Sequence, residues 1–106
     1  MKKTAIITTA IVAIFLFASL AMAGVAATTN KGFIGAFAKE DLKSAISYIS
    51  AKDYDAFQSL LDDTKVFQLK AGLKVFIEKT SWGLAKIRPK GETFTFWVNT
   101  EAVTMD

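Results

Sequence analysis

The sequence predicts an α+β protein with an N-terminal signal peptide, two short helices and then a small, closed antiparallel β-barrel. An uncharged apolar run opens the chain, apolar residues at helical spacing fill its middle, and apolar and polar residues alternate between glycine turns toward its end. We therefore expect a signal peptide over residues 1–23, a flexible arm over 24–38, a helical hairpin over 39–63 and the barrel over 64–106.

The first segment has the three parts of a secretory signal peptide. Two lysines precede an uncharged run over residues 5–20, and Ala21-Met22-Ala23 supplies the small residues that the signal peptidase requires. We expect cleavage after Ala23, and Val25-Ala26-Ala27 offers a second position, after Ala27. An uncleaved anchor is the alternative, because about twenty apolar residues can span a bilayer; the membrane would then be contacted only through this segment. The expected location is periplasmic or secreted.

Removal of this leader changes the charge of the chain. Two of the 13 Lys and Arg residues lie in the leader, which leaves 11 against 10 Asp and Glu and a net charge of +1. The lysines are spread among carboxylates without forming a basic stripe, so nucleic acid is not an expected partner. The sequence has no cysteine, and the exported domain must therefore be stabilised by packing rather than by disulfides.

The segment from Gly24 to Ala38 shows no clear period and contains glycines at 32 and 35, which is typical of a flexible arm. Its apolar residues are expected to contact the domain; they are Phe33, Ile34 and Phe37.

Two helices follow the arm. Apolar residues fall at i, i+3, i+4 and i+7 from Leu42, with acidic residues in the first turn, which predicts a helix over 39–51. Asp53 is a good N-cap for a second helix over 54–62. The apolar stripe of this second helix comprises Phe57, Leu60 and Leu61. Because two short amphipathic helices cannot bury both stripes on each other alone, they need a sheet to pack against.

Four strands are expected over residues 66–69, 73–79, 84–88 and 93–98, joined by a turn at 70–72, a loop at 80–83 and a turn at 89–92. In the last hairpin, pairing Arg88 with Thr93 places Ile87 opposite Phe94 and Ala85 opposite Phe96 on the inner face. Lys86 then faces Thr95, and Leu84 faces Trp97, on the outer face. A slip of one residue would bury Lys86 and Arg88. Closure of such short antiparallel strands into a barrel would remove the exposed sheet edges.

Three stretches carry a resemblance. LKAGLKVFI has a leucine, a turn glycine and an alternating strand, GLAKIRPKG has a strand and a tight turn, and WVNTEAV has a strand and a short tail. Together, residues 66–103 resemble a bacterial Src-homology-3-like domain, and the preceding helices resemble small exported proteins of unknown function. The resemblance implies that the tail after Trp97 is a single 3₁₀ turn leading to a last strand.

The resemblance also bears on the ligand. Proline-binding members carry a proline and a tyrosine at the positions of Asn99 and Ala102, so polyproline binding is not carried over to this chain. In relatives of the cell-wall class, the ligand is a peptidoglycan stem peptide.

The residue types exclude several chemistries. The sequence has no histidine and no cysteine, so the usual zinc and haem ligands and the Ser-His and Cys-His nucleophile pairs are missing. Paired aspartates at 53/55 and 62/63 lie at predicted helix ends, where capping explains them. The spacing around Asp62-Asp63-Thr64 lacks the alternating ligands of a calcium loop. We therefore expect no enzyme activity, no metal and no cofactor.

Aromatic and cationic residues of the hairpin are the candidate ligand-binding residues: Trp82, Trp97, Arg88 and Lys86. An exposed tryptophan beside cations can stack a sugar ring or a peptide while the cations hold a carboxylate. In the alternative interpretation, Trp97 or Phe76 is the surface on which the helices pack. The sequence thus favours a non-catalytic binding module for a cell-wall peptide or an envelope protein partner. The alternative is a structural or accessory subunit of an envelope assembly, with no small ligand.

Overall fold

The computed structural model describes residues 24–106, and the predicted signal peptide lies outside these described residues. The elements are β1 (Val25–Thr29), β2 (Ile34–Ala36), α2 (Lys39–Ser50), α3 (Tyr54–Asp62), β3 (Val66–Gln68), β4 (Lys74–Ser81), β5 (Leu84–Pro89), β6 (Phe96–Asn99), the 3₁₀ turn η1 (Thr100–Ala102) and β7 (Val103–Met105). The predicted α+β class is confirmed. Neither of the described helices is long and apolar enough to cross a bilayer.

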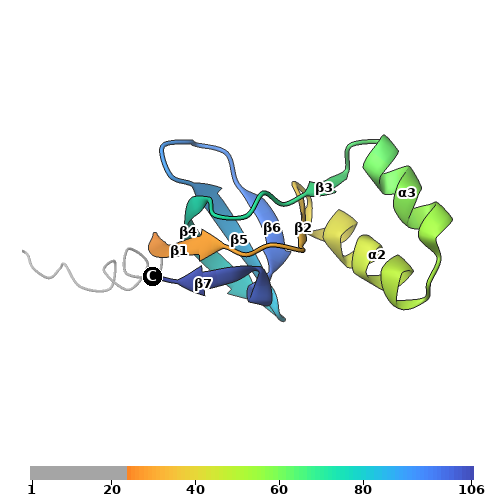
Figure 1. The fold of residues 1–106 in the computed structure, drawn as a ribbon, viewed down its shortest axis with the longest axis horizontal. Helices are drawn as coiled ribbons and strands as arrows, with labels where there is room; N and C mark the ends of the chain where they lie inside the picture. Colours follow the sequence, from red (N-terminus) through yellow and green to blue (C-terminus); the bar gives the residue numbers. More distant parts are fainter. Residues whose placement is uncertain (1–23) are drawn as a thin grey trace, which may run out of the picture.

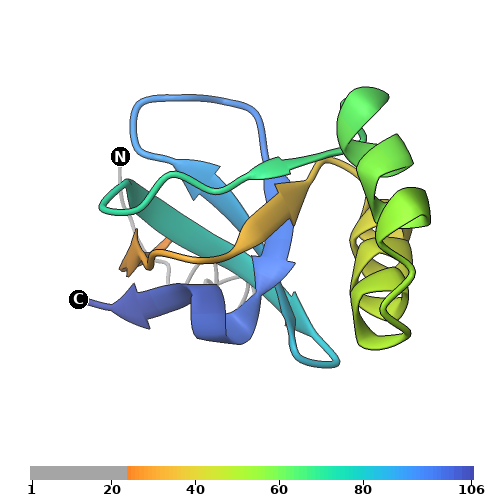
Figure 2. The same ribbon diagram turned by 45° about the vertical axis from the view of Figure 1, so that its right-hand side comes forward.

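The seven strands form one antiparallel sheet in the order β3-β2-β6-β5-β4-β1-β7. The sheet curls around a core that includes Val75, Ile87 and Val98, but β3 and β7 remain its two ends and do not pair. The prediction of a closed barrel is therefore wrong. Figures 1 and 2 show the reason: β3 is held beside the helices, whereas β7 lies toward the opposite side of the molecule with the C-terminus.

The segment predicted as a flexible arm forms β1 and β2 instead. β1 lies between β4 and β7, and β2 lies between β3 and β6. Ala27 and Ala36 are fully buried. Small residues pack where strands approach closely, so they contribute to the core without giving an apolar alternation in the sequence. Consequently the sheet takes strands from both sides of the helical pair in the sequence, and the helices lie together at one end of the molecule (Figure 1).

Both helices lie where the spacing predicts them. The side chain of Asp53 caps α3 by accepting a hydrogen bond from the Ala56 N–H at 3.2 Å. α2 buries Leu42 and Ala45 against the sheet, in a second core cluster that includes Leu84. α3 has no fully buried residue, so α2 is the helix that anchors the pair.

The β5–β6 register differs from the prediction by two residues. Ile87 pairs with Phe96 rather than with Phe94, and Ala85 pairs with Val98 rather than with Phe96. A shift of two residues keeps the side chains of the paired residues on their predicted faces, whereas Phe94 lies before β6 and is not paired. The cause is the connection between the strands: the Lys90 N–H donates to the Lys74 carbonyl at 2.9 Å and the Glu92 N–H donates to the Pro89 carbonyl at 3.0 Å. These bonds carry the chain across the end of β4, so β6 begins later than expected.

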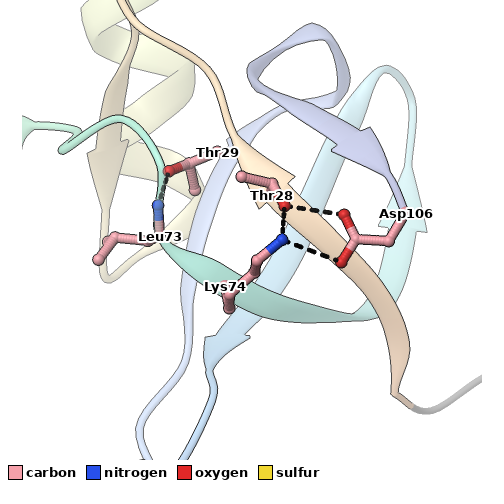
Figure 3. A network of polar contacts seen from close by, with 5 residues as sticks. All are labelled: Thr28, Thr29, Leu73, Lys74 and Asp106. Carbon is pink, nitrogen blue, oxygen red and sulfur yellow. Dashed lines mark hydrogen bonds and ion pairs between the residues drawn. The ribbon is translucent and has the colours of Figure 1, made fainter.

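The tail after Trp97 contains the expected single 3₁₀ turn, η1, which leads into β7. Side chains then tie the end of the chain to β1 and β4. Thr28 Oγ1 donates to Asp106 Oδ1 at 2.8 Å, and Lys74 Nζ lies 3.6 Å from Asp106 Oδ2 (Figure 3). Thr29, buried on the same strand, accepts from the Leu73 N–H at 2.9 Å. These contacts hold β7 in place at the end of the sheet.

Candidate functional site

The turn between β4 and β5 carries the most exposed large apolar side chain in the described chain. The predicted loop at 80–83 is shorter than expected, because Ser81 pairs directly with Leu84 and leaves a two-residue turn. Trp82 (φ 53°) and Gly83 (φ 80°) both have positive φ, as a type I′ hairpin turn requires. A bulky residue is rarely found in this backbone conformation, and Trp82 is 94 % exposed. We call residues 81–84 the Trp82 turn.

A row of residues crosses the sheet near this turn. Lys79 on β4 lies opposite Lys86 on β5, and Lys86 lies opposite Trp97 on β6. Lys39 of α2 places its Nζ 5.3 Å from the centre of the Trp97 ring and 3.3 Å from Ser81 Oγ. Within residues 24–106 the ion pairs join Lys74 to Asp106 and Arg88 to Glu78, so none involves this lysine cluster, Lys39, Lys79 and Lys86.

This arrangement is unfavourable unless an anion is present. Like charges directly opposite each other on neighbouring strands destabilise a sheet, and Lys79 and Lys86 are so placed next to a bulge in β4. The cluster is therefore a surface to which a carboxylate or another anionic group would bind favourably.

The other predicted site residues lie elsewhere or have structural partners. Trp97 is half-buried and packs against the core cluster beneath the helices, so it is the surface on which the helices pack. Arg88 donates from Nε to Glu78 Oε2 at 2.8 Å and from Nη1 to the Glu92 carbonyl at 3.1 Å. Its guanidinium also covers the Phe76 ring, at 5.0 Å from the centroid. Trp82 and Lys86 remain as candidate contact residues, and Arg88 is engaged within the fold.

An apolar pocket of about 290 Å³ adjoins the Trp82 turn. It is lined by Val25, Ile77, Lys79, Thr80, Ala85, Thr100, Val103 and Met105. Thr80 leads into the turn, and the N–H of Thr100 donates to the Gly83 carbonyl at 2.9 Å, which fixes the turn to η1. Lys79 is the only charged lining residue. A size near 300 Å³ with few polar groups is typical of a site for one side chain or a small ligand.

Sequence reasoning missed this pocket and two of the three lysines. Val25 and Met105 lie in the first and last described strands, and no local pattern indicates that they meet. Lys79 lies within β4 and has no local signal of its own. The unusual feature of the sequence is the turn itself, where Trp-Gly stands in place of the favoured Asn-Gly.

A second, larger groove of about 570 Å³ lies at the other end of β5, where Pro89 is among its lining residues. Four phenylalanines dominate it: Phe37, Phe67, Phe94 and Phe96. Phe37 is 58 % exposed and Phe94 is 46 % exposed, although the predicted register placed Phe94 inside. Gly35 allows the close packing here, because a Cβ at this position would lie 2.8 Å from Phe67 Cε1. We call this surface the phenylalanine groove.

The apolar pocket offers lysine, threonine and aliphatic groups, and within residues 24–106 no three His, Cys, Asp or Glu side chains are grouped for a metal ion. A scan against known protein families and searches of the curated proteins and of the solved structures each gave no match to this chain.

Proposed function

We propose that this chain is an exported, non-catalytic binding module with a Src-homology-3-like fold that recognises a cell-wall peptide or an envelope protein partner. Export follows from the charge and apolar pattern of residues 1–23, and the location is periplasmic or secreted. The ligand contacts the Trp82 turn, the lysine cluster and the apolar pocket. Trp97 lies beneath this surface and contributes to the site through its contact with Lys39.

The strand connections support the fold assignment. β4, β5 and β6 follow one another as antiparallel neighbours, a 3₁₀ turn comes next, and β7 returns to pair with β1. This is the sequence of elements that the resemblance implies for its closing part. The helical pair and β2 and β3 are inserted between β1 and β4, and the sheet ends are unpaired, which departs from a minimal closed barrel.

One observation supports the binding site above all others: an exposed tryptophan in a left-handed turn beside lysines that have no carboxylate partner in the described chain. Each feature costs stability in the isolated protein. Strained residues persist where they serve a function, because substitution by residues that fit better is easy. A flat aromatic ring, neighbouring cations and an apolar pocket together match a peptide that carries a carboxylate.

The test is a binding experiment with the purified exported chain. We expect it to be retained by peptidoglycan sacculi or to bind an envelope protein in a detergent-free envelope fraction. Retention is expected to weaken as ionic strength rises, because exposed charge pairs are screened. Trp82→Ala is expected to abolish retention, and Lys86→Gln to weaken it. Lys65→Gln, an exposed lysine before β3, is the matched control.

Retention that is equal for the wild-type chain and Trp82→Ala would contradict the proposed site, provided that both chains have the same circular dichroism spectrum. No retention by either material would contradict the binding function itself.

The phenylalanine groove favours a second candidate, an accessory subunit of an envelope assembly. Exposed aromatic side chains in a groove are enriched at protein–protein contacts. In this case Phe37→Ser, combined with Phe94→Ser, is expected to release the protein from a complex seen by native electrophoresis of the envelope. A monomer of unchanged mobility in that extract would argue against the accessory role.

A further inference from the structure

The outer edge of β7 has backbone groups without a partner in the described chain. β7 is the last strand of the sheet and pairs on one side only, with β1 (Figures 1 and 2). Two backbone bonds fix the alternation of this ladder: Asn30 N–H to Ala102 O at 2.8 Å and Asp106 N–H to Ala26 O at 3.1 Å. Because bonded and non-bonded pairs alternate, the backbone groups of Val103 and Met105 point away from β1.

Most of these groups remain available. The Val103 N–H donates to the Thr100 carbonyl and is satisfied. The Val103 carbonyl and both backbone groups of Met105 have no backbone partner among residues 24–106, because β7 pairs only with β1 and no other backbone bond reaches them. Met105 is 69 % exposed, so a second strand can approach this edge.

The apolar pocket opens beside the same edge. The side chains of Val103 and Met105 form one wall of the pocket, and Ile77 and Thr80 of β4 form another. A strand added to β7 would therefore have its inward side chains directed into the pocket, because successive side chains of an L-peptide strand alternate between the two faces. Lys79 is the one charged lining residue and forms no ion pair in the described chain, which favours a carboxylate on the incoming segment.

We propose that the β7 edge takes an extended segment of a partner protein, which pairs with β7, inserts one aliphatic side chain into the apolar pocket and holds a carboxylate against Lys79. This inference depends on the proposed binding function and selects the protein partner over the wall peptide. A peptidoglycan stem peptide alternates L and D residues, so it cannot continue a ladder of L residues. Main-chain bonds supply affinity in this mode, and the pocket supplies selectivity.

The probe is the synthetic peptide acetyl-Thr-Leu-Thr-Leu-Thr-Leu-Glu, titrated into the ¹⁵N-labelled exported chain and followed by NMR. We expect the amides of Met105 and Thr80 to shift, and the amide of Met105 to exchange more slowly with solvent. An analogue that is N-methylated at its central leucine is the matched control, because it cannot complete the ladder.

Two variants at one position separate the backbone from the side chain. Met105→Pro removes the outward N–H without removing a bond to β1, and proline is tolerated at such edge positions. Met105→Ile keeps the N–H and an apolar side chain. We expect Met105→Pro to weaken peptide binding about tenfold, because the loss of one hydrogen bond costs about that much at the upper end of the usual range of hydrogen-bond energies. Met105→Ile is expected to change the peptide affinity little.

The outcomes distinguish this inference from the function on which it depends. Equal peptide affinity for Met105→Pro and Met105→Ile overturns strand addition while the binding module stands. Trp82-dependent retention on sacculi, with no peptide binding, also overturns strand addition and leaves the wall peptide as the ligand. If the chain binds neither sacculi, nor envelope proteins, nor the peptide, both proposals are contradicted.

Discussion

Trp82 has a backbone conformation that is costly for a residue of its type. Its backbone occupies the left-handed region at φ 53°, which costs an L-residue with a side chain roughly 1–2 kcal/mol. The Asn-Gly pair favoured in type I′ turns would relieve this strain. The sequence predicted Trp82 as a candidate contact residue and predicted a longer loop around it, because the pairing of Ser81 with Leu84 follows a bulge in β4.

We predict that Trp82→Asn raises the free energy of unfolding by about 1 kcal/mol while it abolishes partner binding. The measurement is urea unfolding, in which the midpoint should rise at an unchanged slope. Trp82→Ala is the control. Alanine tolerates the left-handed conformation less well than asparagine does, so this variant should gain less free energy of unfolding. A lower midpoint for Trp82→Asn than for the wild-type chain would show that the tryptophan stabilises the turn.

Thr29 is the buried polar residue of the described chain, at 3 % exposure. Its hydroxyl donates to the Lys70 carbonyl at 2.6 Å and accepts from the Leu73 N–H at 2.9 Å (Figure 3 shows the second bond). We predict that Thr29→Val lowers the free energy of unfolding by about 1–3 kcal/mol, because a buried N–H and carbonyl lose their partner. The neighbouring Thr28 forms an exposed hydrogen bond to Asp106. Thr28→Val should lower the free energy of unfolding by less than about 0.5 kcal/mol. Equal losses in urea unfolding would contradict this account.

Elements with a strong local signal were predictable, and elements without one were not. The helices have a clear 3.6-residue spacing and an Asp53 cap, so their predicted ends agree with the structure within one residue. The arm was missed because β1 consists of alanine, threonine and one valine. The end of β5 and the start of β6 depend on the bond from Lys90 to Lys74, a contact between distant residues that no local pattern encodes.

The α2 helix provides a test of how the helical pair is held. Leu42 is fully buried against the sheet, whereas Ile49 on the same helix is 40 % exposed. We predict that Leu42→Ala lowers the free energy of unfolding by about 2–5 kcal/mol, because it leaves a cavity in the core. Ile49→Ala should cost much less. Urea unfolding of the two variants is the measurement, and comparable losses would indicate that the helices pack on the sheet differently.

At the scale of the whole molecule, the open sheet could not be inferred from residue patterns. Closure depends on whether β3 and β7 meet, and the helices inserted between β2 and β3 hold β3 away from β7. The same opening leaves the β7 edge and the apolar pocket accessible. The sequence therefore predicted the candidate residues that lie close together in the chain, Trp82 and Lys86. It did not predict the part of the candidate site that is built from residues distant in the sequence.

The position of β1 between β4 and β7 also favours the first of the two expected cleavage positions, after Ala23. Cleavage after Ala27 would remove the residues that pair with Val75, Phe76 and Ile77, together with the fully buried Ala27 itself. The edge strand β7 would lose part of its only neighbour as well. We therefore predict that the exported chain begins at Gly24, as intact mass spectrometry would show.

A chain of residues 24–106 should unfold cooperatively on heating, and one of residues 28–106 should not. Cooperative unfolding of the shorter chain at the same temperature would mean that β1 is dispensable, and the sheet would then have to be held by β4, β5 and β6 alone.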